Sequence, residues 1–303
     1  MPLLRQLWVL CRPRGFVWVG VVPLVGYGIA HWSRALPLRA PGAMGLVFVA
    51  WLLLNAGTLW WNAALDQDEG PVLYGERATV PPHIRAWGSL ALAGCVALAA
   101  WASPWAGACA GVCAGLAVAY SHPSTAWKAR PLAGPLVNVA GYGLLSPLAG
   151  YALVGVPLDP RSAAMIAAIA TSVFGAYLIA QTFQEAEDRA RGYRTLVATR
   201  GPAAVIRVAR GAFAAAHLGV FAFGALGWLP RATLLGLPAA LVLDRWLRHA
   251  PTPPTERWAR DVLTLALLVG ALAVLGAGLT WIWQVAHGLP LAGLGTAAGA
   301  PAR

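Results

Sequence analysis

The sequence contains few charged residues and few cysteines for a chain of its length. Only 11% of its 303 residues are charged, against roughly 25% in an average soluble domain. A soluble fold of this size would need more polar surface, so the composition argues against one. The four cysteines, at positions 11, 95, 109 and 113, show no metal-binding spacing and no disulfide framework, and we expect them to pack among apolar side chains. The N-terminus lacks the cleavage site of a secretory signal peptide.

Apolar residues make up 59% of the chain, and they occur in long runs. Runs that approach the thickness of a bilayer core predict transmembrane helices. The abundant glycine and alanine suit close packing between such helices. We therefore predict an all-α, polytopic membrane bundle of about nine transmembrane helices around a central cavity, forming a single domain over residues 1–303. The predicted spans are 16–32, 42–65, 86–102, 105–120, 132–154, 162–187, 202–227, 231–249 and 258–286.

The basic residues are distributed unequally between the two ends of these spans. With the N-terminus in the cytoplasm, fifteen of the 22 Lys and Arg residues fall on the cytoplasmic side. The opposite side holds Arg34, Arg39, Arg161, Arg231 and Arg303. This bias predicts a cytoplasmic N-terminus, cytoplasmic active-site loops and an external C-terminus, and we expect a bacterial inner membrane. Topology and membrane lipid explain the net charge of +11, so we expect no nucleic-acid partner.

Seven of the 11 carboxylates fall in two short stretches, at the ends of the second and sixth predicted spans. Carboxylates at membrane depth are costly, so this clustering indicates a functional site. On a continuous helix Asn62, Asp66 and Glu69 share one face. The same spacing predicts a second face formed by Gln181, Gln184, Glu185 and Asp188. Hard oxygen ligands suit Mg²⁺, which proteins usually hold together with substrate phosphate oxygens. The predicted metal ligands are Asp66, Asp68, Glu69, Gln184, Glu185 and Asp188.

A polar segment between the two acidic stretches, residues 120–130, carries cations that suit a diphosphate. Arginine can bind phosphate through two parallel hydrogen bonds, and lysine acts as a mobile point charge. A simpler explanation remains open, because topology alone places Lys and Arg on the cytoplasmic side and the glutamines would also bond between helices. The predicted substrate-binding residues are Asn62, Tyr120, Lys128, Arg130, Asn138, Gln181, Gln184, Arg189 and Arg194.

Taken together, these motifs resemble those of the UbiA superfamily of intramembrane prenyltransferases. That family has nine transmembrane helices, an NDxxDxxxD motif after helix two and a DxxxD-type motif after helix six. Asn62 and Asp66 match the first motif and Asp188 matches the second, and the resemblance runs from Arg12 through the ninth span. The acids of three other motif positions are replaced here by Ala63, Gly70 and Gln184. These replacements leave the number of bound Mg²⁺ ions open.

The resemblance implies Mg²⁺-dependent transfer of a prenyl group from a polyprenyl diphosphate to a lipophilic acceptor, often an aromatic ring. It implies catalytic roles for Asp66, Lys128 and Asp188. Aromatic side chains that would stabilise the carbocation are Trp60, Trp61, Tyr142, Phe174 and Tyr177. Two alternatives stay open, a terpene cyclase that uses no acceptor and a non-enzymatic lipid-binding or transport protein. The sequence does not determine the acceptor, the prenyl chain length or the oligomeric state.

Overall fold

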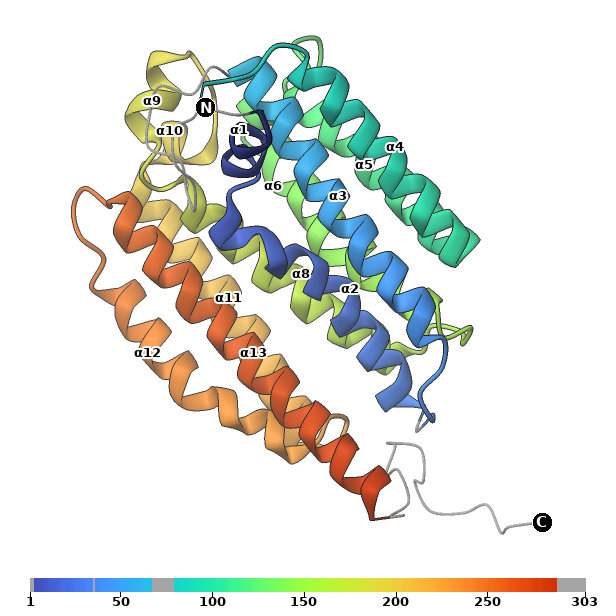
Figure 1. Cartoon of the computed structure of the whole chain (residues 1–303). Coiled ribbons are helices and arrows are strands. Elements are labelled where there is room, and N and C mark those ends of the chain that lie inside the picture. The colour runs from blue at the N-terminus through green and yellow to red at the C-terminus, as the bar shows by residue number, and fades with distance from the viewer. Residues whose placement is uncertain (1–2, 35, 67–78, 288–303) are drawn as a thin grey trace.

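The computed structural model describes residues 3–34, 36–66 and 79–287, and every regular element within these ranges is a helix (Figure 1). Each predicted span corresponds to a helical segment, which confirms the all-α bundle. Eight of these segments are α2 Pro13–Ser33, α3 Pro41–Asp66, α4 Ile84–Ala102, α5 Pro104–Ser121, α8 Pro160–Gln181, α11 Pro202–Ala225, α12 Leu237–Arg248 and α13 Glu256–Ala286. The predicted span 132–154 is built from α6 Ala133–Asn138, η2 Val139–Leu145 and α7 Ser146–Ala152.

Short elements complete the described chain, and most of them gather at one end of the bundle. They are α1 Leu3–Leu10, η1 Trp127–Ala129, α9 Glu185–Ala190, α10 Leu196–Arg200 and η3 Arg231–Gly236. The end of α13 lies at the opposite end of the bundle from α9 and α10 (Figure 1). Within the described residues, six helices are long and apolar enough to cross a membrane. The cytoplasmic position of the end that carries α9 stays a prediction.

The helices begin where the sequence provides suitable starts. Proline occupies the first turn of α2, α5, α8 and α11, where its missing N–H costs no intrahelical hydrogen bond. Asp159 caps α8, because its Oδ1 accepts hydrogen bonds from the backbone N–H groups of Arg161 and Ser162, both at 3.0 Å. These local signals explain why the observed boundaries fall close to the predicted ones.

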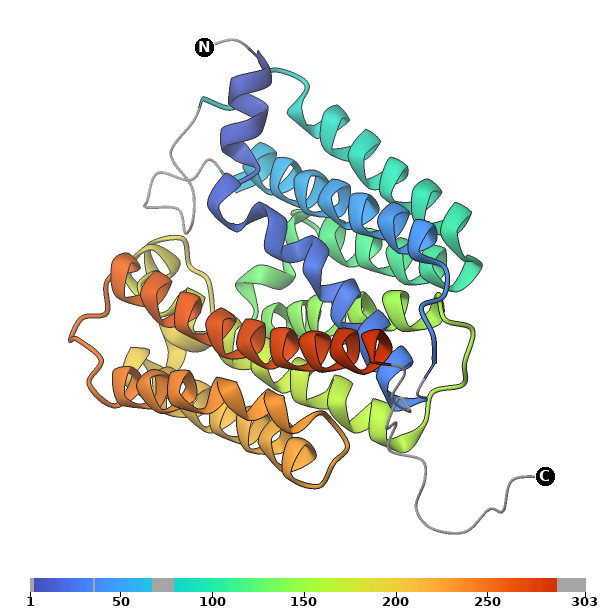
Figure 2. The ribbon, with the colours of Figure 1, turned by 60° about the horizontal axis from the view of Figure 1, so that its bottom comes forward.

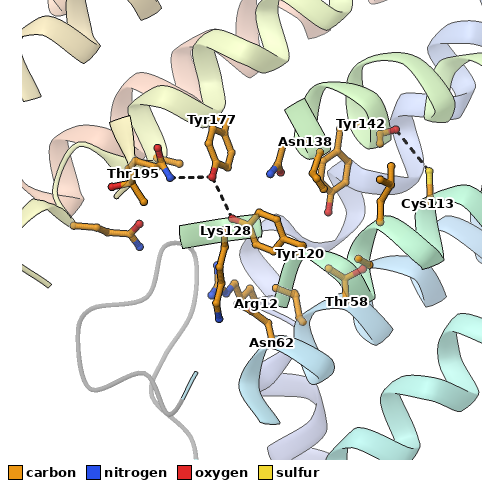
Figure 3. Close-up of a pocket in the computed structure, with 18 of the residues that line it drawn as sticks. Arg12, Thr58, Asn62, Cys113, Tyr120, Lys128, Asn138, Tyr142, Tyr177 and Thr195 are labelled. Carbon is orange, nitrogen blue, oxygen red and sulfur yellow. Dashed lines mark hydrogen bonds between the residues drawn. The ribbon is translucent and has the colours of Figure 1, made fainter. Parts of the chain in front are cut away.

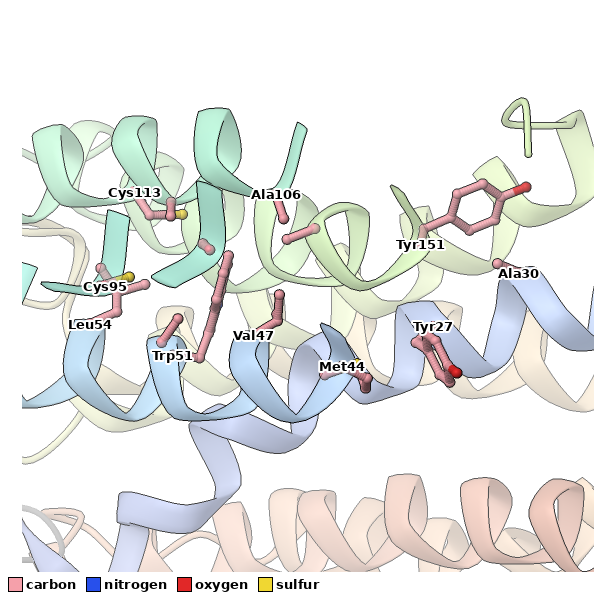
Figure 4. Close-up of a cluster of buried hydrophobic side chains, with 14 of the residues drawn as sticks. Tyr27, Ala30, Met44, Val47, Trp51, Leu54, Cys95, Ala106, Cys113 and Tyr151 are labelled. Atoms are coloured by element: carbon pink, nitrogen blue, oxygen red, sulfur yellow. The ribbon is translucent and has the colours of Figure 1, made fainter. Parts of the chain in front are cut away.

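Two apolar cores hold the bundle together. The first is formed largely by α2, α3, α4, α5 and α7, and the second by α8, α11, α12 and α13. Figure 4 shows Val47 and Trp51 of α3 within the first core, near the helix that carries Ala106 and Cys113. Figure 2 shows that α3, α4 and α5 lie on one side of the bundle and α11, α12 and α13 on the other. The candidate site lies between these two groups.

Helices α2 and α7 approach each other so closely that only glycine fits at the contact. A Cβ atom on Gly150 would lie 1.8 Å from the backbone oxygen of Pro23, and one on Gly26 would lie 1.8 Å from that of Pro147. Backbone atoms cannot move aside as flexible side chains can. The contact therefore fixes the spacing of α2 and α7.

Replacing Gly150 by alanine is expected to destabilise the protein by about 1–3 kcal/mol, the usual cost of overpacking. The physical reason is that α2 and α7 must separate to admit the methyl group. The thermal unfolding midpoint of the purified protein in detergent measures this effect. Gly28→Ala in α2 is the matched control, because a Cβ there meets no atom within 4 Å. Equal midpoints for the two variants would contradict the predicted contact.

Candidate active site

A cavity of about 310 Å³ opens between α3, α5, the α6–η2 segment, α8 and α9. Polar side chains line the part near α9, among them Arg12, Asn62, Lys128, Gln184, Glu187, Asp188 and Arg191. The deeper part is more apolar and is lined by residues that include Leu54, Leu59, Cys113, Leu116 and Val137. Figure 3 shows Arg12, Asn62 and Lys128 close together at the polar end, with Cys113 farther away. The cavity therefore suits a ligand with a charged head and an apolar tail.

Asp188 is the most buried carboxylate of the polar end, with a relative exposure of 8%. Its Oδ2 accepts a hydrogen bond of 2.6 Å from the hydroxyl of Thr195. Burial raises the pKa of Asp188, and the nearby Glu187 carboxylate raises it further. A buried anion of this kind is stabilised by a bound cation, since the cation compensates for the lost hydration.

Lys128 lies on the short helix η1, which connects α5 and α6 in the chain, and it lines the cavity. Burial lowers the pKa of Lys128 to about 8, and the Arg191 guanidinium adds to the effect. Two cations held near each other favour binding of a multivalent anion, because the anion relieves their repulsion. A diphosphate is an anion of this kind.

The prediction that Gln181, Gln184, Glu185 and Asp188 share one helical face is wrong. Helix α8 ends at Gln181, and the chain makes a turn in which the Gln184 backbone N–H donates to the Gln181 carbonyl at 3.0 Å. Glu185 then begins the separate helix α9. The turn is stabilised by the Thr182 hydroxyl, which bonds the Ile179 carbonyl and competes with helix continuation. The predicted span 162–187 is thus too long.

The predicted site residues fall into two groups, those that line the cavity and those that do not. Seven of them line the cavity, namely Asn62, Tyr120, Lys128, Asn138, Gln181, Gln184 and Asp188. Glu185 instead forms an ion pair with Arg189 at 2.7 Å, and neither residue lines the cavity. Arg130 and Arg194 are exposed and also lie outside it. Asp66 is the last residue of α3, at the cavity end, and Asp68 and Glu69 lie outside the described residues.

Several lining residues were not predicted from the sequence. Arg12 comes from the start of α2, far away along the chain, so only the fold could bring it here. Glu187 and Arg191 form an ion pair at 2.7 Å across one helical turn, a spacing that the sequence does contain. Thr195 lies seven residues after Asp188, and its hydroxyl donates the hydrogen bond to that carboxylate. Of the five predicted aromatic residues, Tyr142 and Tyr177 line the cavity.

Hydrogen bonds join several polar side chains at the cavity, and Figure 3 shows the one between Tyr177 and Tyr120. The Gln181 amide nitrogen donates to the Tyr177 hydroxyl at 2.8 Å, and that hydroxyl lies 3.3 Å from the hydroxyl of Tyr120. The Ser121 hydroxyl donates to Asn62 Oδ1 at 2.6 Å. Gln181 Oε1, by contrast, is buried and has no hydrogen-bond partner. A buried acceptor without a partner is costly, so this oxygen is suited to bind a cation or a ligand donor.

The oxygen atoms at the polar end fit a Mg²⁺ ion that completes its coordination with substrate. Among the described residues no group of three or more His, Cys, Asp or Glu side chains could form a metal cage. The available oxygens are the carboxylates of Glu187 and Asp188 and the amides of Gln181 and Gln184. Mg²⁺ commonly uses one or two carboxylates together with phosphate oxygens and water.

A second, mainly apolar cavity of about 600 Å³ lies on the other face of α5. Its lining includes Trp61, Leu92, Gly115, Val118 and His122. Helix α5 therefore has cavities on two faces, with Cys113, Leu116 and Tyr120 toward the first cavity and other residues toward the second. The second cavity lacks the carboxylates and the lysine of the first.

The comparisons with known proteins agree with this architecture. A sequence profile described as the UbiA prenyltransferase family matches residues 19–262. A solved UbiA homologue from Archaeoglobus fulgidus, bound to GPP and Mg²⁺, superposes with a TM-score of 0.69 at 14% identity, over 90% of this chain and 99% of that one. An apo UbiA homologue from Aeropyrum pernix K1 gives 0.62 at 17% identity, over 91% and 98%. No curated protein sequence matches the chain significantly.

A helical membrane bundle with a polar cavity near one end defines the class of this protein as an integral membrane protein with an internal cavity. The chain belongs to the UbiA prenyltransferase family. A structure described as digeranylgeranylglyceryl phosphate synthase shares the fold, with a TM-score of 0.63 at 14% identity, over 93% of this chain and all of that one.

Proposed function

We propose that the protein transfers a prenyl group from a prenyl diphosphate to a lipophilic acceptor, with the help of Mg²⁺. The observation that carries this proposal is the polarity of the cavity. Carboxylates and cations occupy the end near α9, and apolar side chains line the rest. Membership of the prenyltransferase family supports the same reaction. The relative from Archaeoglobus fulgidus was solved with GPP and Mg²⁺, which is a ligand pair of this chemistry.

In this proposal the polar end holds the diphosphate. Lys128 and Arg12 bind its oxygens, while Asp188, Glu187, Gln181 and Gln184, which line the cavity, would hold Mg²⁺. Asp66, the last residue of α3, stays a predicted ligand. When bound there, Mg²⁺ would supply positive charge against the negative charge that develops on the leaving group. The bond between prenyl C1 and oxygen breaks, and its electron pair leaves with the diphosphate.

The apolar part of the cavity protects and directs the allylic cation. Leu59, Leu116 and Val137 exclude water, which would otherwise quench the cation. The rings of Tyr142 and Tyr177 line the same space and are suited to stabilise positive charge through their faces. The acceptor supplies the electron pair for the new bond to C1 and loses a proton, which the released diphosphate can accept.

The purified protein in liposomes is expected to release diphosphate from a prenyl diphosphate only when Mg²⁺ and an acceptor are both present. Diphosphate release and the prenylated product are measured together, with aromatic and glycerol-phosphate acceptors tested in parallel. Adding EDTA is expected to abolish the release, and restoring Mg²⁺ is expected to recover it. Appearance of a cyclised product without acceptor would instead support a terpene cyclase. No release from any prenyl diphosphate would contradict the proposed function.

A further inference from the structure

The deep end of the cavity is closed by a small group of residues, Leu54, Cys113, Gly141 and Ser146, which we call the floor. These residues come from α3, α5, η2 and α7, so the floor joins four elements. The positions of two residues along α3 place the floor at the deep end of the cavity. Leu54 and Asn62 both line the cavity from α3, and Leu54 lies eight residues farther from the polar end.

Buried hydrogen bonds connect the residues of the floor to one another and to Trp51 behind them. Ser146 Oγ accepts a hydrogen bond of 2.7 Å from the indole N–H of Trp51 and donates one of 2.7 Å to the Gly141 carbonyl oxygen. That oxygen also accepts a contact of 3.9 Å from the Cys113 thiol. Trp51 and Ser146 are both 0% exposed. The indole therefore fills the space behind the floor, and an apolar chain cannot pass between Ser146 and α3 without breaking buried hydrogen bonds.

The depth of the cavity limits the length of a bound chain. Eight residues of α-helix between Asn62 and Leu54 correspond to about 12 Å. An extended isoprene unit has four carbon–carbon bonds of about 1.5 Å and spans about 5 Å. Two to three units thus fill the distance from the polar end to the floor. The volume of about 310 Å³ lies at the small end of the range of ligand pockets.

We infer that the floor selects short prenyl diphosphates, of ten to fifteen carbons, over those of twenty carbons or more. This inference rests on the proposed prenyl-transfer function and adds the substrate size to it. Gly141 and Leu54 are the residues that set the limit, because both line the cavity at its deep end. Trp51 acts behind them as a positioning residue through its bond to Ser146.

Gly141 provides a sharp test because a Cβ atom there meets nothing within 4 Å. The Cβ atom of a leucine at this position would therefore meet no protein atom, and the rest of its side chain would add volume at the floor. Gly141→Leu is expected to lower the rate with the fifteen-carbon substrate at least tenfold relative to the five-carbon one. Leu54→Ala removes side-chain volume from the floor and is expected to raise the rate with the twenty-carbon substrate at least tenfold relative to the ten-carbon one.

The experiment measures diphosphate release by the full-length protein in liposomes with prenyl diphosphates of five, ten, fifteen and twenty carbons, in the presence of Mg²⁺ and of the acceptor that gives the fastest transfer in the assay above. Gly115→Leu is the matched control, because Gly115 lines the second cavity and a Cβ there also meets nothing within 4 Å. It is expected to keep the wild-type order of substrates. Size-exclusion profiles in detergent report whether each variant folds. If the Gly141→Leu protein does not fold, Leu54→Ala alone tests the inference.

Three possible results separate this inference from the proposed function. A wild-type protein that releases diphosphate equally fast from the ten- and twenty-carbon substrates would overturn the floor and leave prenyl transfer intact. Folded, active Gly141→Leu and Leu54→Ala proteins with the wild-type order of substrates would overturn it in the same way. A wild-type protein inactive with all four substrates would refute the proposed function itself.

Discussion

Replacing Asp188 by asparagine is expected to lower the rate of prenyl transfer about a thousandfold, as loss of a group that stabilises a charged transition state commonly does. Asp188 is the most buried carboxylate that lines the cavity. An asparagine has nearly the same shape, and its amide oxygen can still accept the 2.6 Å hydrogen bond from Thr195. The substitution thus removes the negative charge and leaves the packing of α9 in place.

The measurement is transfer of a labelled prenyl group by the purified protein in liposomes over a range of Mg²⁺ concentrations. Weaker metal binding predicts that the Asp188→Asn protein needs more Mg²⁺ for its residual activity. Glu185→Gln is the matched control on the same helix, because Glu185 pairs with Arg189 and does not line the cavity. We expect it to retain activity within a few-fold. Wild-type activity in Asp188→Asn would refute the assigned role.

Replacing Lys128 by methionine is expected to lower kcat/KM about a hundredfold, mainly through a higher KM for the prenyl diphosphate. A charge-assisted hydrogen bond to phosphate in a partly buried site contributes about 2–3 kcal/mol, which corresponds to this factor. Methionine keeps the length and apolar stem of lysine, so packing changes little. Steady-state kinetics with varied prenyl diphosphate measure the effect. Arg130→Met is the matched control, since Arg130 lies two residues away and is exposed outside the cavity.

The same lysine predicts how activity depends on pH. Burial lowers the pKa of Lys128 to about 8, so the side chain carries its charge below that pH and loses it above. The value of kcat/KM is therefore expected to fall as the pH rises through about 8, because kcat/KM reports ionisations of the free enzyme. A Lys128→Arg protein stays charged and is expected to lose this decline. A wild-type profile that stays flat to pH 9.5 would contradict the prediction.

The fold could be predicted from the sequence because its physical causes are local. A run of apolar residues of bilayer length, started by Pro or by the Asp159 cap, becomes a helix wherever it lies in the bundle. The site was harder to predict because it depends on details of a few residues. The helical spacing of Gln181 and Glu185 suggested one face, but the Thr182 hydroxyl and the following turn interrupt the helix.

Residues brought together only by the tertiary fold were not predictable. Arg12 reaches the cavity from the start of α2, and the helical spacing that groups the acidic residues does not connect it to either acidic stretch. Conversely, Arg130 and Arg194 resemble phosphate-binding residues by charge and position, yet they are exposed outside the cavity. A single sequence gives the charge of a loop, but it does not tell which of its side chains turns inward.

The π-helical segment η2 has a consequence for how the cavity wall can vary. Its hydrogen bonds join residues five apart, as between the Ser146 N–H and the Gly141 carbonyl, so the segment holds one residue more than an α-helix of the same length. One residue rotates a helix by about 100°. A regular α-helix over the same residues would therefore turn Asn138 and Ser146, which are eight residues apart, to directions about 80° apart around its axis. The π-helical turn brings both residues toward the cavity that they line, so an insertion or deletion in this segment would change which side chains form the wall.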